Sequence, residues 1–172
     1  MVSIASILFF FVNIWYFPII FGILVFTSGL LDGVDGAVAR RTNKVTLKGG
    51  LLDSILDRFS DSFLYMGFMK YYYLGITIIF IPAYIWVFLA ILGTFLVSYS
   101  RAIAEKYLKN YNCDIGFGAR SERLFILSIF SWFLIPIVGL VLLSIISIGT
   151  AVYRQIKYFK QLKKLNKKLE NN

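Results

Sequence analysis

Residues 71–100 read YYYLGITIIFIPAYIWVFLAILGTFLVSYS, a stretch without one charged side chain. A helix needs about 20 apolar residues to cross the hydrocarbon core of a bilayer. Residues 1–31 and 124–153 are also uncharged and also exceed that length. The sequence therefore predicts an all-α protein, a polytopic bundle of membrane-spanning helices.

The composition of the whole chain supports this prediction. Of its 172 residues, 59% are hydrophobic and 16% are charged, whereas a soluble domain is about 45–50% apolar and 25% charged. The length suits one membrane domain over 1–172. Lys and Arg outnumber Asp and Glu by 18 to 9. In so apolar a chain this excess indicates membrane topology, and because no nucleic-acid motif accompanies it, we expect no nucleic-acid partner.

Turn residues and interfacial aromatic residues divide the chain into spans. We expect spans at about 16–41, 49–70 and 79–108, and a hairpin of two spans broken near Pro136. The hairpin returns the lysine-rich tail to the side that carries the other basic loops, which the positive-inside rule places in the cytoplasm.

The start of the chain is expected to belong to one more span. Residues 1–12 would measure about 18 Å as a helix, too short to cross a membrane, so we expect a preceding segment. The prediction is then a multi-pass cell-membrane protein with about six spans, the first one truncated.

Acidic residues are concentrated around one short loop. Five of the nine are Asp32, Asp35, Asp53, Asp57 and Asp61. The first two are three residues apart and the last three step by four, so each set lies on one face of its helix. Charged groups inside spans are costly and by default functional. Carboxylates in a chain without histidine favour hard cations such as Mg²⁺ or Mn²⁺.

The residues between these carboxylates suit a phosphate ligand. Gly36 and Ala39 are small enough for close approach of a helix or ligand. Gly49 and Gly50 open the second helix, where backbone N–H groups can face a phosphate. Arg40 can bind a phosphate bidentately.

This pattern resembles the signature of the CDP-alcohol phosphotransferases. It reads DGVDGAVAR at 32–40, followed by Gly49, Asp53 and Asp57 at fixed spacing. The resemblance implies an integral membrane enzyme, commonly with six spans and a cytoplasmic-side active site. Such enzymes use two divalent ions to transfer a phosphatidyl-type group from a CDP-linked lipid to an alcohol, and they release CMP.

The resemblance also implies roles for single residues. The implied metal ligands are Asp32, Asp35, Asp53 and Asp57. Asp57 is in addition the implied general base for the acceptor hydroxyl. The residues implied to hold the CDP moiety are Gly36, Arg40 and Thr46. Asp61 lies outside the signature, and either a supporting or a purely structural role is open for it.

Three arginines bear on the acceptor. Arg101, Arg123 and Arg154 each lie near the cytoplasmic end of a different predicted span, where arginines also serve as topological anchors. Their segments, SYSRAIAE at 98–105, RSERL at 120–124 and VYR at 152–154, resemble those that bind inositol phosphate in one branch of the family. The wording LDSILDRFSD at 52–61 is similar to archaeal members, which use CDP-archaeol. Inositol 1-phosphate is therefore the expected acceptor.

Alternatives stay open at this point. Within the family, glycerol phosphate or serine are other acceptors. In a different class, the aspartates line the pathway of a cation transporter. The basic amphipathic tail at 156–172 is either a surface helix on anionic membrane lipids or a solvated extension, in both cases cytoplasmic. The resemblance also implies a homodimer.

Overall fold

The computed structural model describes residues 2–12, 14–42, 46–108, 115–116 and 119–170, with the backbone alone at 2, 3, 36, 39, 40 and 167–170. Its elements are α1 (Val2–Phe11), α2 (Phe17–Arg41), α3 (Leu47–Met66), the 3₁₀ turn η1 (Gly67–Met69), α4 (Lys70–Tyr73), β1 (Thr77–Ile78), β2 (Ile81–Pro82), α5 (Ala83–Tyr107), α6 (Arg120–Trp132) and α7 (Pro136–Glu170). The all-α prediction is confirmed, apart from a two-residue antiparallel ribbon.

The helix bounds follow the sequence signals closely. The helix expected at 16–41 is α2, and the break expected near Pro136 separates α6 from α7. Leu134 lies in this turn with a positive φ of 63°. The helix expected from residue 79 begins four residues later, because β1 and β2 pair across a tight turn first.

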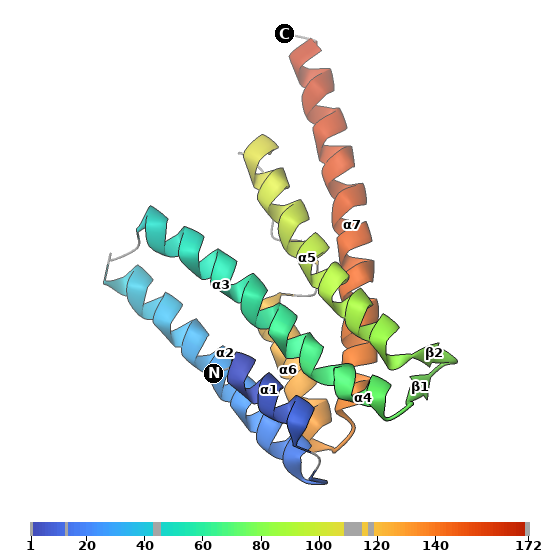
Figure 1. Ribbon diagram of the computed structural model, residues 1–172. Helices are drawn as coiled ribbons and strands as arrows, with labels where there is room; N and C mark the ends of the chain where they lie inside the picture. The colour runs from blue at the N-terminus through green and yellow to red at the C-terminus, as the bar shows by residue number, and fades with distance from the viewer. Residues whose placement is uncertain (1, 13, 43–45, 109–114, 117–118, 171–172) are drawn as a thin grey trace.

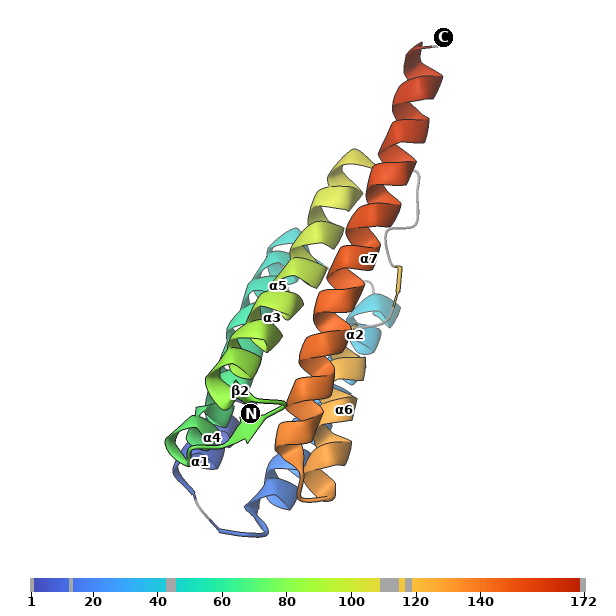
Figure 2. The same cartoon turned by 90° about the vertical axis from the view of Figure 1, so that its right-hand side faces the viewer.

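The helices form a bundle in which neighbours along the chain are not always neighbours in space (Figure 1). The most extensive packing joins α5 to α7 and α2 to α6, while α1 packs against both α2 and α3. In Figure 2, α5 and α7 run side by side and α7 extends well beyond the other helices. Helix α6 therefore stands between α2 and α7, with α3 on the far side of α5 from α7.

An aromatic cluster closes the bundle at the end away from the α2–α3 connection. The ring of Phe9 stacks on Phe21 with centroids 4.3 Å apart, and Phe68 meets Phe21 edge-on at 5.8 Å. All three side chains are fully buried. Aromatic pairs in these geometries add stability beyond the area they bury, so α1, α2 and η1 are joined firmly here.

Small residues allow α5 and α7 to approach closely. A Cβ placed on Gly93 would lie 2.8 Å from the Cβ of Ser147. The buried Ser144 hydroxyl donates to the backbone carbonyl of Trp86 across the interface, at 3.0 Å. Small-residue contacts and interhelical hydrogen bonds of this kind replace the hydrophobic effect as packing forces inside membranes.

The outer surface of the bundle is apolar. Within the described part of the chain, three segments are long and apolar enough to cross a membrane, namely Phe17–Asp35, Ala83–Tyr107 and Pro136–Asn166. Large side chains such as Phe80, Phe88 and Phe133 are mostly exposed, which suits contact with lipid. Helix α3 is 20 residues long but carries three aspartates, and α6 has 13 residues.

The tail predicted at 156–172 continues α7 without a break as far as Glu170. Its apolar residues do not share one environment. Tyr158, Leu162 and Leu165 pack against Leu108 near the end of α5, whereas Ile156 and Phe159 are exposed. The first turns of the tail are thus part of the α5–α7 packing.

Candidate active site

Three of the predicted ligands meet between α2 and α3. Asp32, Asp53 and Asp57 each offer a carboxylate oxygen, and these oxygens lie within 4.8 Å of one another. Spacing by four residues brings Asp53 and Asp57 to the same face of α3. Asp35, almost one turn further along α2, is exposed and lies outside this group.

Helix α3 begins at a fixed point because Thr46 caps it. The Thr46 side-chain oxygen accepts a hydrogen bond from the backbone N–H of Gly49 at 3.0 Å, which satisfies one of the free donors of the first turn. The cap sets where Asp53 and Asp57 fall relative to the loop. Thr46 is also one of the residues predicted to hold CDP. The other two, Gly36 and Arg40, lie on α2, where the structure describes their backbone alone.

Arg120 joins the two acid-bearing helices to α6. Its Nη1 lies 2.7 Å from an oxygen of Asp32 and 2.7 Å from an oxygen of Asp57. Its Nε donates to Asp61 at 3.2 Å. The guanidinium group therefore contacts three carboxylates from two helices, and it partly offsets their mutual repulsion.

Asp61 anchors a second arginine. Nη1 of Arg123 lies 3.3 Å from the other Asp61 oxygen, and both side chains are about 3% exposed. Nε of Arg123 is buried and makes no hydrogen bond with any described residue. An unpaired donor in a buried cation is costly, so this guanidinium group is suited to receive an anion at Nε.

The three predicted acceptor arginines surround one cavity of about 350 Å³. The polar side chains that line it are Ser54, Asp57 and Arg58 from α3, Ser98, Arg101 and Glu105 from α5, Arg120 and Arg123 from α6, and Arg154 from α7. Four helices thus contribute to it, and five of these side chains are arginines.

Arg154 and Arg101 are held very differently. Arg154 is 2% exposed; it donates from Nε to the carbonyl of Ile115 at 2.7 Å and from Nη1 to the carbonyl of Val97 at 3.0 Å. Arg101 is largely exposed and pairs with Glu105 one turn along α5, at 2.8 Å. Arg154 is a buried charge held by two backbone carbonyls, whereas Arg101 is a partly exposed charge paired within its own helix.

Sequence reasoning did not assign a role to Arg120 and left that of Asp61 open. Arg120 lies 59 residues beyond Asp61 and 88 beyond Asp32, so no helical spacing relates it to them. The signal that was present is chemical. A group of carboxylates inside an apolar bundle needs a nearby cation, and Arg120 sits just before an uncharged stretch.

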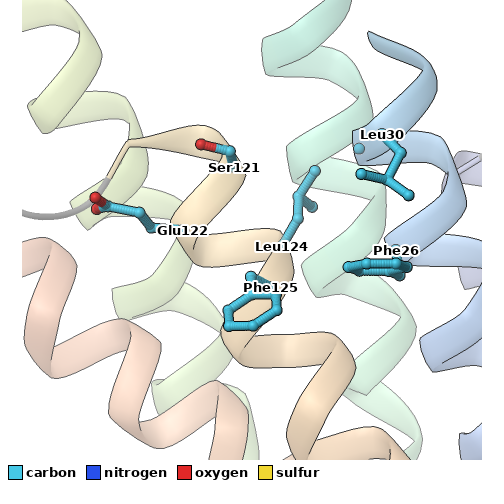
Figure 3. A pocket seen from close by; sticks show the side chains of 7 residues that line it. Phe26, Leu30, Ser121, Glu122, Leu124 and Phe125 are labelled. Atoms are coloured by element: carbon cyan, nitrogen blue, oxygen red, sulfur yellow. The ribbon is translucent and has the colours of Figure 1, made fainter. Parts of the chain in front are cut away.

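Two largely apolar pockets flank α6. One, of about 300 Å³, lies between α2 and α6; Figure 3 shows Phe26 and Leu30 facing Leu124 and Phe125 across it, with Ser121 and Glu122 at its edge. The other, of about 860 Å³, lies between α6 and α7 and includes Arg123 at its polar end. Both are suited to apolar ligands.

Comparison with known proteins identifies the family of the chain. Residues 1–153 match the family model described as CDP-alcohol phosphatidyltransferase. The chain is 35% identical to the archaetidylinositol phosphate synthase of Pyrococcus horikoshii over 84% of this chain and 72% of that protein. It is 32% identical to the synthase of the same name from Methanothermobacter thermautotrophicus, over 81% and 70% of the two chains.

Solved structures show the same fold. The chain superposes on the phosphatidylinositol phosphate synthase of Mycobacterium tuberculosis with a TM-score of 0.62, for the complex with manganese and citrate, at 24% identity and over 92% of this chain and 89% of that one. The complex of that synthase with CDP-DAG gives a TM-score of 0.59, also at 24% identity, over 92% of both chains.

The fold and site thus define a membrane-embedded transferase. The chain belongs to the CDP-alcohol phosphatidyltransferase family. It is an enzyme that transfers a lipid phosphate group to an alcohol. The alternative of an aspartate-lined cation transporter is wrong, because the chain belongs to a family of transferases.

Proposed function

We propose that this enzyme transfers an archaetidyl or phosphatidyl group from a CDP-linked lipid to inositol 1-phosphate and releases CMP. One observation carries the proposal: Asp57 belongs both to the cluster of three carboxylates (Asp32, Asp53 and Asp57) and to the wall of the arginine-lined cavity. The group that activates an acceptor and the charges that bind its phosphate then face the same space. The names of the archaeal relatives point to the same acceptor.

The cluster of three carboxylates is suited to bind divalent cations. Oxygen atoms from Asp32, Asp53 and Asp57 lie within 4.8 Å of one another, and such oxygens are what Mg²⁺ and Mn²⁺ prefer. We expect these three residues, with Asp35, to hold two ions. When bound, the ions would supply charge stabilisation for the pyrophosphate and the departing CMP. The M. tuberculosis synthase was crystallised with manganese.

Asp57 is the proposed general base. The acceptor oxygen forms a bond to the lipid-bearing phosphorus, and the bond from that phosphorus to the oxygen bridging to CMP breaks. The proton of the acceptor hydroxyl passes to the Asp57 carboxylate. Glu105 also lines the cavity. It is less suited to act as the base, because it is paired with Arg101 and does not belong to the cluster of three carboxylates.

The arginines select for a phosphorylated acceptor. Arg123 has an unpaired donor at Nε, Arg154 is fixed by two carbonyls, and Arg101 is the most exposed of the three. Guanidinium groups bind phosphate oxygens with strong charge-assisted hydrogen bonds. This lining favours inositol phosphate or glycerol phosphate over serine, which carries no phosphate.

The lipid substrate would lie against α6. Its hydrocarbon chains suit the apolar pockets on the two sides of this helix, of which Figure 3 shows the one between α2 and α6. Residues Gly36, Arg40 and Thr46 remain the predicted contacts of the CDP moiety. A multi-pass topology with the carboxylates and the tail at the cytoplasmic face is proposed from the charge distribution, and a homodimer from the resemblance.

The decisive experiment is a CMP-release assay on purified protein in lipid nanodiscs. A CDP-linked lipid is offered with inositol 1-phosphate, glycerol phosphate or serine. We expect release with inositol 1-phosphate, and a loss of about 10²–10⁴-fold in kcat for Asp57→Asn, as for removal of a general base. CMP release with glycerol phosphate and none with inositol 1-phosphate would refute the assignment of the acceptor.

A matched control is Glu170→Gln, the same carboxyl-to-amide change at the end of α7. It lies 16 residues beyond Arg154, about 24 Å along the helix. We expect it to keep wild-type kcat. Equal losses in both variants would mean that the change in Asp57→Asn does not report on the reaction.

A further inference from the structure

Arg120 contacts the same carboxylates that the proposed cation site uses. Its Nη1 lies 2.7 Å from Asp32 and from Asp57, and both of these aspartates belong to the three-residue carboxylate group. A guanidinium group and a divalent cation bound to the same oxygens repel each other. Arg120 and the cations therefore compete for these two side chains.

Arg120 has a second anchor that the cations do not need. Its Nε donates to Asp61 at 3.2 Å, and Asp61 is 2% exposed and lies outside the carboxylate group. Asp61 is in turn held by Arg123. When Nη1 loses its partners, Nε keeps the side chain in place.

Arg120 also lies beside the cavity proposed to bind the acceptor phosphate. It lines the cavity that contains Arg101, Arg123 and Arg154, and its side chain is 18% exposed. A guanidinium group held at Nε presents its two Nη atoms to this cavity after a modest rotation. Planar donors of this kind bind a phosphate bidentately.

We infer that Arg120 is a shared arginine that links cation binding to acceptor binding. It pairs with Asp32 and Asp57 in competition with the divalent cations. When the cations take these carboxylates, Arg120 remains on Asp61 and binds the phosphate of the acceptor. Cation binding then raises the affinity for phosphate, and by thermodynamic reciprocity phosphate raises the affinity for the cation. The inference rests on the proposed cation site.

The first test measures the Mn²⁺ affinity of the full chain in nanodiscs, from the electron paramagnetic resonance signal of free Mn²⁺. Arg120→Gln removes the competing charge, so we expect it to bind Mn²⁺ about 3- to 10-fold more tightly than wild type. Lys160→Gln is the control, because it removes one positive charge from an exposed position on α7 that does not line the cavity. We expect its Mn²⁺ affinity to stay within about twofold of wild type.

The second test measures the coupling itself. Inorganic phosphate is titrated by calorimetry with and without Mg²⁺. We expect Mg²⁺ to tighten phosphate binding in wild type and in Lys160→Gln, and to do so at least about threefold less in Arg120→Gln. A purely structural role for Arg120 would not produce tighter cation binding together with weaker coupling.

The outcomes separate this inference from the proposed function. If wild type binds Mn²⁺ and Arg120→Gln binds it equally or more weakly, the shared role of Arg120 is refuted and the cation site stands. If wild type binds no Mn²⁺, both fall. Arg120→Lys serves if the glutamine variant does not fold. Its ammonium group lacks the second nitrogen that holds Asp61 while Nη1 contacts Asp32 and Asp57, so it competes less well for these two aspartates. Tighter Mn²⁺ binding than wild type is therefore expected, and weaker binding would overturn the inference.

Discussion

Two helix pairs in this molecule carry opposite charges and are held together in opposite ways. Helices α5 and α7 pack closely along their length, and the buried Arg154 is fixed between them by two carbonyls. Helices α2 and α3 carry the aspartates but make little direct contact with each other. Asp32 is 47% exposed, whereas Arg154 is 2% exposed.

The difference shows that one site can combine rigidly placed arginines with aspartates whose arrangement depends on a cation. The positive side is set by packing before any ligand arrives, so its geometry costs nothing at the moment of binding. The negative side depends on a cation, either Arg120 or a bound metal ion, to hold like charges together. Stability changes should therefore be large in the α5–α7 pair and dependent on cations in the α2–α3 pair.

The largest effect on stability is expected when the buried Arg154 is replaced. Arg154→Met leaves the carbonyls of Val97 and Ile115 without their donors, and we expect a loss of about 2–4 kcal/mol in the free energy of unfolding. Arg101→Met removes an exposed pair and should cost less than about 1 kcal/mol. Unfolding in detergent, followed by circular dichroism, compares the two. Equal losses would show that Arg154 is not fixed by packing.

A smaller effect is expected from a single methyl group. Gly93→Ala places a Cβ 2.8 Å from that of Ser147, so α5 and α7 must move apart at a cost of about 1–3 kcal/mol. Gly33→Ala in α2 meets nothing within 4 Å, and it should be neutral or stabilise by up to about 1 kcal/mol. The same unfolding measurement decides, and a loss in Gly33→Ala as large as in Gly93→Ala would contradict the contrast.

The smallest expected effect is the stabilisation of the aspartate-bearing helices α2 and α3 by a bound cation. Mn²⁺ at ten times its dissociation constant should stabilise the fold by about 1.4 kcal/mol. Hydrogen exchange should then slow in α2 and α3, around Asp32 and Asp57, and stay unchanged in α5 and α7. Protection confined to α5 and α7 would place the cation elsewhere.

Much of the architecture was predictable because it depends on local pattern. The uncharged stretches located α2, α5 and α7, and the four-residue steps placed Asp53 and Asp57 on one face. The start of α5 was less predictable, because the pairing of 77–78 with 81–82 delays the helix. That delay depends on positive φ angles at Ile79 and Phe80, which β-branched and aromatic residues seldom adopt.

The ion-pair network was not predictable, because it depends on tertiary packing. Arg120 reaches Asp32 because α6 packs against α2, and the same guanidinium group also contacts Asp61 on α3. Arg123 and Asp61 likewise come from different helices, and they pair where both side chains are buried. Sequence identified which residue types the chemistry needs, whereas the distances between helices decided which arginine faces which carboxylate.

The continuous helix α7 has a practical consequence for imaging the enzyme. Its 35 residues measure about 52 Å, and the last turns extend beyond the rest of the bundle (Figure 2). A helical partner fused in register after Glu170 would continue the same rod. Such a rigid fusion adds mass beyond the end of the bundle, which would help particle alignment in electron cryo-microscopy of so small an enzyme.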